Sequence, residues 1–276
     1  MLNKFTCIFS NQKPIIGMLH LDYLLSSPKY KGLDYVINKA KTDIDSLQKG
    51  GIDGILIENW KEESVGEFVS LETAMCFLVI VDRLSKYIKV PFGINVLNND
   101  YKTSFLVAKL TGASFVQMDV FVDNVKSNFS FNKEVAIKPF VIRPNPKKIV
   151  EYAKIIGAGK IPLLVFVQPK HYKLIEKNKS IEKSVKQAVK YGASGIIVTK
   201  ETGVAPTVDL ILKAKKVAGD VPVGIGSGFN VGNAKGFLKV ADFATVGTSI
   251  KVDSITDNPV DENSVKFLMK VSKKNE

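Results

Sequence analysis

The chain has 276 residues, of which 45% are hydrophobic and 24% charged, and its formal net charge is +12. This length suits one α/β barrel of about 250 residues, and the composition is that of a globular protein rather than a disordered one. Arg83 and Arg143 are the only arginines, and the lysines are scattered along the chain. Arginine is the usual reader of phosphate and guanine, so we expect no nucleic-acid partner.

The two cysteines, Cys7 and Cys76, are isolated and have neither metal-ligand nor redox spacing. This pattern favours a reducing compartment, and we expect a cytoplasmic location. The N-terminus lacks the apolar core and cleavage site of a signal peptide. No apolar stretch approaches the ~20 residues needed to cross a bilayer, so we expect no integral membrane segment.

Short apolar runs alternate with amphipathic segments along the chain. The runs, nearly continuous in Ile, Val, Leu and Phe, predict buried parallel strands at Pro14–His20, Gly54–Asn59, Pro91–Val96, Ser114–Val120, Ile161–Gln168, Ser194–Thr199, Val221–Gly226 and Phe243–Gly247. The segments between them predict helices near 34–49, 70–88, 100–111, 146–157, 180–191, 207–218, 230–239 and 261–273. Expected N-caps are Asp100, Asn145 and Thr207, and expected C-terminal glycines are Gly50, Gly112 and Gly192.

Eight strand–helix units predict an α/β protein with a single (β/α)8 TIM barrel domain over residues 1–276. Within this domain, residues 1–13 are expected to form an N-terminal extension. A doubly wound open sheet has the same periodicity and is the alternative. Residues 121–143 break the rhythm, with Pro139 inside the segment and Pro144 and Pro146 just after it. We expect a long βα loop after the fourth strand, acting as a lid or as the contact of a homo-oligomer.

The segment Val221–Lys251 reads as strand, glycine turn, helix, strand and second glycine turn. Two adjacent turns rich in N–H groups, beside a helix N-terminus, form the recurrent phosphate site of such barrels. We therefore expect a phosphorylated small molecule as the partner. Lys251 could add a charge contact or begin a surface helix. The expected phosphate-binding residues are Gly226, Ser227, Gly228, Gly247, Thr248 and Lys251.

Polar residues recur where the apolar strands end, and strand ends form the active-site mouth of a barrel. Glu58 follows an apolar run that could raise its pKa, so it is the first candidate for acid/base chemistry; a structural carboxylate is the alternative. Lys170 fits a substrate clamp better than a Schiff base, and solvent exposure is its alternative. The candidate catalytic residues are Glu58, His20, Lys170, His171 and Asp119. The candidate substrate-binding residues are Asn59, Asn95, Asp100, Thr199 and Thr202.

No cofactor is predicted. A divalent metal could be held by Glu58, Asp119 and a histidine, but no HxH or HExxH spacing supports such a site. The chain also lacks GxxxxGK[ST], which excludes a P-loop.

Several motifs resemble the BtpA/SgcQ family: GMLHLD at 17–22, GGIDGILIEN at 50–59, PFGINVLNND at 91–100, the KH pair at 170–171, TKETG at 199–203, GIGSGFNVGNA at 224–234, VGTSIK at 246–251 and NPVD at 258–261. The matches run in order over nearly the whole chain. The resemblance implies a TIM barrel similar to the ribulose-phosphate-binding barrels. The family takes its name from a factor needed for photosystem I accumulation, and other members lie among carbohydrate genes.

The chain departs from the family pattern in the polar half of the expected site. Asn98 stands where the family has arginine, Gln117–Val120 replaces an Arg-Val-Asn-Val segment, and Phe166 replaces an acidic residue. The resemblance and the motifs together favour an enzyme acting on a sugar phosphate or a nucleoside-like phosphate, as an isomerase, a lyase or a glycosidic-bond enzyme. A non-enzymatic assembly or stability factor is the alternative.

Overall fold

Eight parallel strands close into a barrel in the computed structural model, which describes residues 5–61, 66–127 and 139–273. The barrel strands are β1 (Ile15–His20), β2 (Gly54–Glu58), β3 (Phe92–Asn95), β4 (Phe115–Met118), β7 (Leu163–Val167), β9 (Gly195–Val198), β10 (Val223–Ile225) and β11 (Phe243–Val246), and β11 pairs with β1 to complete the ring. The predicted (β/α)8 barrel is confirmed, and the open-sheet alternative is wrong.

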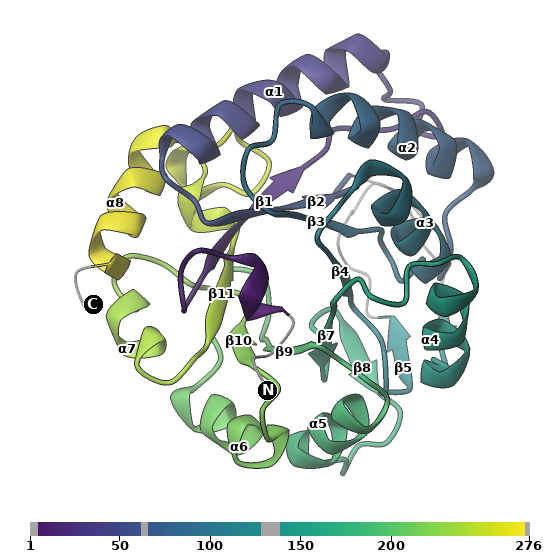
Figure 1. Ribbon diagram of the computed structural model, residues 1–276, viewed down its shortest axis with the longest axis vertical. Helices are drawn as coiled ribbons and strands as arrows, with labels where there is room; N and C mark the ends of the chain where they lie inside the picture. The colour runs from purple at the N-terminus through teal and green to yellow at the C-terminus, as the bar shows by residue number, and fades with distance from the viewer. Residues whose placement is uncertain (1–4, 62–65, 128–138, 274–276) are drawn as a thin grey trace.

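The helices of the described residues form the outer ring (Figure 1). They are α1 (Leu33–Lys49), α2 (Leu71–Ser85), α3 (Tyr101–Thr111), α4 (Pro146–Ile155), α5 (Ile181–Lys190), α6 (Val208–Ala218), α7 (Ala234–Leu238) and α8 (Glu262–Lys273). None of them is long and apolar enough to cross a membrane.

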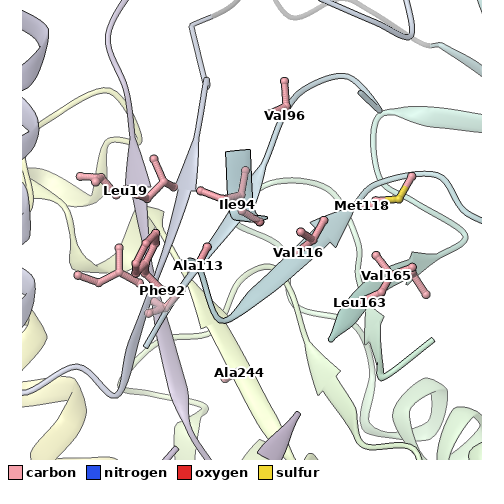
Figure 2. Packing of buried hydrophobic residues seen from close by; sticks show 14 of the residues in the cluster. Leu19, Phe92, Ile94, Val96, Ala113, Val116, Met118, Leu163, Val165 and Ala244 are labelled. Atoms are coloured by element: carbon pink, nitrogen blue, oxygen red, sulfur yellow. The ribbon is translucent and has the colours of Figure 1, made fainter. Parts of the chain in front are cut away.

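Each strand buries both of its faces, because alternate side chains point in opposite directions. The outward set packs beneath the helices and includes Ile94, Val116 and Val165 (Figure 2). The inward set forms a separate cluster inside the barrel, to which Phe115 and Phe166 belong. This double burial explains why the strands read as continuous apolar runs.

The segment expected as an N-terminal extension fills one end of the barrel (Figure 1). Phe5 and Phe9 are buried, and the Phe5 ring lies 5.6 Å from that of Phe115 and 5.0 Å from that of Phe243, edge to face in both pairs. Phe115 and Phe243 begin their strands. This end is therefore the N-terminal end of the strands, and the opposite mouth is left for a site.

The structure confirms the predicted helix-capping residues, except that one C-terminal glycine is displaced by one residue. The side chains of Asp100, Asn145 and Thr207 each accept a hydrogen bond from a backbone N–H of the first turn, which confirms these N-caps. Gly50 has an ordinary φ of −71°, whereas Gly51 takes the left-handed φ of 83° after α1. The expected C-terminal glycine of α1 is thus one residue early.

The long loop after β4 contains strands that the sequence did not reveal. Within 121–143, β5 (Val125–Ser127) pairs with β6 (Val141–Ile142), and β5 also pairs with β8 (Tyr172–Leu174) in an antiparallel sheet. Residues 128–138 of the expected loop lie outside the described residues. The β5–β8 pairing ties this loop to the segment after β7, which carries Lys170 and His171.

Candidate functional site

A cavity of about 620 Å³ opens at the C-terminal ends of the barrel strands. Every barrel strand, or the loop that follows it, contributes to its lining. Clefts of this size commonly hold small-molecule ligands. The cavity lies at the mouth opposite the phenylalanine-filled end.

Two buried carboxylates lie on one side of the cavity, joined by an amide. Glu58 ends β2, Asn95 ends β3, and Asp119 directly follows β4. Asn95 Nδ2 donates to Glu58 Oε2 at 2.7 Å and to Asp119 Oδ1 at 3.2 Å. Asn95 thus holds together two carboxylates that would otherwise repel each other when charged. The structure brings these three predicted residues together.

Burial raises the pKa of both carboxyl groups. The pKa of Glu58 rises to about 7 because of burial and the neighbouring charge of Asp119, against the opposing effects of Lys170 and Asn95. The pKa of Asp119 rises to about 6 because of burial, again opposed by Lys170 and Asn95. Near neutral pH the pair therefore shares about one proton, so it can both accept and donate one.

His20, at the end of β1, lies next to this pair. Its ring stacks on Trp60 with centroids 4.9 Å apart, and its Nε2 lies 4.0 Å from Glu58 Oε1. Burial, with help from the charges of Lys251 and Lys170, lowers its pKa well below the usual value, although the Thr256 carbonyl opposes this shift. The ring is therefore neutral, and its approach to Glu58 is not an ion pair.

The Lys170–His171 turn lies on the neighbouring wall. His171 takes a left-handed φ of 66°, and its Nε2 lies 2.9 Å from Thr202 Oγ1. Burial and the charge of Lys170 lower its pKa to about 3. The exposed carboxylate of Glu201, 3.4 Å from Nδ1, therefore faces a neutral ring. Lys170 is the cation of this wall, with its Nζ 5.9 Å from the Phe166 ring centroid.

A buried ion pair that the sequence did not reveal supports this turn from behind. Asp123 accepts a hydrogen bond from Gln168 N at 2.8 Å and pairs with Lys179 Nζ at 2.6 Å, with Ser184 Oγ also bonded to it. Gln168 Nε2 donates to the Lys179 carbonyl. Gln168 itself has a φ of 51°, so the network holds a strained backbone in place. Trp60, which lines the cavity two residues after β2, was missed, and Gln117 was named only as a departure from the family pattern.

The two glycine turns line the opposite wall, as predicted. Within the described residues, the backbone N–H groups of Ser227 and Gly228 have no acceptor. The Ser227 hydroxyl is occupied by Lys200 N and the Val204 carbonyl. α7 begins only at Ala234, so the expected helix N-terminus is not part of this wall. The wall can therefore offer an anion backbone N–H groups from the turns rather than a helix end.

Gly228 also has a structural reason to be glycine. Its φ is 64°, and a Cβ atom there would lie 2.1 Å from the backbone N of Ala205. Gly247 is different, because its φ is −126° and an added Cβ would meet only Met18 and His20, at 3.3 Å or more. Gly247, Thr248 and Ser249 line the cavity.

Lys251 does not reach the expected phosphate site. Its side chain is 1% exposed, and its Nζ lies 3.4 Å from Asp43 Oδ2 beneath the second turn. Asp43 also accepts a hydrogen bond from Val260 N at 2.8 Å. Lys251 therefore joins α1 to the segment before α8 and does not line the cavity.

Three of the expected substrate-binding residues have structural roles instead. Asp100 caps α3 and accepts from Val69 N, while both polar atoms of the Asn59 side chain bind the backbone of Leu97. The Thr199 hydroxyl lies 3.1 Å from Ser227 Oγ. Neither these three residues nor Asn95 line the cavity, so Thr202 is the one expected substrate-binding residue that does.

No group of three or more His, Cys, Asp or Glu side chains in the described part of the chain has the arrangement of a metal site.

The fold is that of a TIM barrel, with a cavity at the C-terminal ends of its strands. The chain belongs to the BtpA family, whose model matches residues 11–274. An uncharacterised protein of Pyrococcus furiosus is 32% identical over 264 residues, covering 95% of each chain. The photosystem I biogenesis protein BtpA of a Synechocystis species is 28% identical, covering 88% of this chain and 82% of its own. The putative sgc region protein SgcQ of Escherichia coli is 28% identical over 96% of each.

Solved structures similar to this chain share its barrel at low sequence identity. Tryptophan synthase of Mycobacterium tuberculosis has a TM-score of 0.60 and 13% identity, covering 95% of this chain and 93% of its own. Thiamine phosphate pyrophosphorylase of Pyrococcus furiosus has a TM-score of 0.53 and 14% identity, covering 99% and 97%. These likenesses establish the fold.

Proposed function

We propose that this protein is an enzyme that binds a phosphorylated small metabolite and moves a proton on it with the Glu58–Asp119 pair. The observation that carries the proposal is the amide-bridged pair of buried carboxylates, with pKa values of about 7 and about 6. General acid–base catalysis works best with groups that titrate near the operating pH. A carboxylate with a purely structural role does not require a pKa near neutral pH.

The paired carboxylates suit a reaction that takes a proton from one atom and returns one to another. The ionised member accepts the proton while the protonated member can donate its own. This is the requirement of isomerisation and of aldol-type lyase chemistry at a carbon beside a carbonyl. Lys170, the cation that lowers the pKa of both groups, is placed to stabilise negative charge that develops on the substrate.

The glycine turns supply the anchor in this proposal. A phosphate held by the N–H groups of Ser227 and Gly228 would lie across the cavity from Glu58, with Thr248 and Ser249 beside it. Binding energy from a remote phosphate can be used to orient the reacting carbon. Thiamine phosphate pyrophosphorylase, one of the similar barrels, is itself named for a phosphorylated compound, which agrees with this role.

The test begins with the protein as purified. Small molecules released from native protein are identified by mass spectrometry, and thermal unfolding is followed with increasing inorganic phosphate. A ligand that binds only the folded state must raise the apparent stability. The proposal expects a bound phosphate ester and a phosphate-dependent rise in Tm. Turnover of the identified ester should be lost in Glu58→Gln and kept in Glu151→Gln, an exposed carboxylate on α4.

The name of the Synechocystis relative supports the alternative, an assembly role without catalysis. That alternative predicts no released ester, no stabilisation by phosphate and full function of Glu58→Gln in binding its protein partner. These results would refute the enzyme.

A further inference from the structure

Two buried polar atoms of the cavity residues lack a hydrogen-bond partner within the described part of the chain. They are Gln117 Oε1 and His20 Nδ1. Gln117 is 2% exposed, and the His20 side chain is 8% exposed. Buried polar groups in folded proteins are nearly always paired, because an unpaired one costs stability. An exception on the wall of a cavity indicates a partner that arrives with a ligand.

Gln117 lies deeper in the barrel than the carboxylate pair. It belongs to β4, and its neighbours Val116 and Met118 pack outward against the helices, so its own side chain points inward. Asp119 follows two residues later on the same face, about 6–7 Å nearer the mouth. The Gln117 carboxamide therefore forms part of the cavity floor, together with Phe166 and Thr245.

We propose that the Gln117 carboxamide binds a hydroxyl group of the ligand, which makes the ligand a polyhydroxylated phosphate, that is, a sugar phosphate or polyol phosphate. The inference rests on the proposed function for the phosphate. A hydroxyl group both donates and accepts hydrogen bonds. It can therefore pair with the Gln117 carboxamide whether the oxygen or the NH₂ group of the carboxamide faces it. An apolar ring in the same place would leave the carboxamide unpaired.

The groups around Gln117 also favour hydroxyl donors. Among the described residues, Glu58 Oε1 accepts no hydrogen bond and lies 4.0 Å from His20 Nε2, and Asp119 accepts only from Asn95. With about one proton shared by the pair, three of its four carboxylate oxygens can accept hydrogen bonds but cannot donate them. This half of the cavity is therefore rich in acceptors. A chain of hydroxyl groups supplies donors to several of them at once.

The experiment compares two glutamines whose side-chain oxygen is buried without a hydrogen-bond partner among the described residues. Gln187 Oε1, on α5, is also buried without a partner among the described residues, but Gln187 does not line the cavity. Gln117→Met and Gln187→Met make the same chemical change, one inside the site and one outside it. Binding is measured by calorimetry with ribose 5-phosphate, fructose 6-phosphate, glucose 6-phosphate and inorganic phosphate, and Tm is measured without ligand.

The proposal expects at least one sugar phosphate to bind wild-type protein more tightly than inorganic phosphate does. Gln117→Met should weaken that sugar phosphate about tenfold, as for the loss of one good hydrogen bond, and leave inorganic phosphate unchanged. It should also raise the Tm of the free protein, because it removes an unpaired polar group. Gln187→Met should leave both affinities unchanged.

Three results would overturn the inference. If inorganic phosphate is the only one of the four compounds that binds, or if Gln117→Met keeps the wild-type affinity for the sugar phosphate, the phosphate site stands and the hydroxyl contact is wrong. If neither inorganic phosphate nor any sugar phosphate binds, the proposed function itself fails.

Discussion

Replacing Glu58 with glutamine should stabilise the protein above neutral pH and abolish the proposed proton transfer. Burial raises the pKa of Glu58 from 4.5 to about 7, so the folded state holds this proton more tightly than the unfolded state. Between these two pH values the unfolded chain has lost the proton and the folded chain keeps it. Stability therefore falls as pH rises through this window, and the full loss is present above about pH 7.

The shift of about 2.5 pH units, at about 1.4 kcal/mol per unit, gives a loss of about 3–4 kcal/mol from Glu58 alone, of which the lower value is used here. Glutamine stays neutral and escapes this loss, and its amide oxygen can still accept the hydrogen bond from Asn95 Nδ2. An unfolding entropy of about 2.1 cal/mol/K per residue over 276 residues converts 3 kcal/mol to about 5 °C in Tm.

The assay is denaturant or thermal unfolding of wild type, Glu58→Gln and the surface control Glu151→Gln from pH 4.5 to 8. We expect Glu58→Gln to match wild type near pH 4.5 and to gain up to about 3 kcal/mol by pH 8. The control should show no pH-dependent difference. A Glu58→Gln variant that is less stable at pH 8, or whose difference from wild type does not change with pH, would refute the reasoning.

Three further variants test other parts of the site. Gly247→Ala should fold, because the nearest atoms to its added Cβ lie at 3.3 Å or more. The added methyl group should leave less room for an anion at the second glycine turn, so calorimetry should show inorganic phosphate binding at least tenfold more weakly. Lys251→Met should leave that binding unchanged and lower the unfolding free energy by about 3–5 kcal/mol, because it leaves Asp43 buried without its cation. Lys170→Met should move the pH–rate profile of the identified reaction to higher pH, because the lysine charge lowers the pKa of Glu58. An unmoved profile would contradict that coupling.

The barrel could be predicted because its strands and helices are local patterns. Eight apolar runs with helix caps such as Asp100 between them specify parallel strands covered on both faces. The short strand β8 was missed because three residues carry little periodicity and pair with β5, almost fifty residues earlier. The filling of the barrel by Phe5 was missed for a related reason: aromatic residues in a short N-terminal segment do not reveal which surface they cover.

The sequence could predict which candidate residues come together where the position along a strand decides the direction of a side chain. Glu58, Asn95 and Asp119 meet because each stands at the C-terminal end of its strand, and parallel strands bring those ends together. Lys251 was misplaced because the residue after a glycine turn can point toward the mouth or beneath it. Its partner Asp43 is about two hundred residues away, so no spacing in the sequence links the two.

The two halves of the cavity do not carry equal weight as evidence for function. The first glycine turn has structural reasons for its sequence, since Gly228 packs against Ala205 and the Ser227 hydroxyl joins two loops. Those residues would be kept even without a phosphate. The Glu58–Asp119 pair has no such reason, because burying two carboxylates side by side lowers stability at neutral pH. The proposed proton transfer explains why this cost is retained at the mouth of the barrel, so the acid pair is the stronger argument for the proposed enzyme.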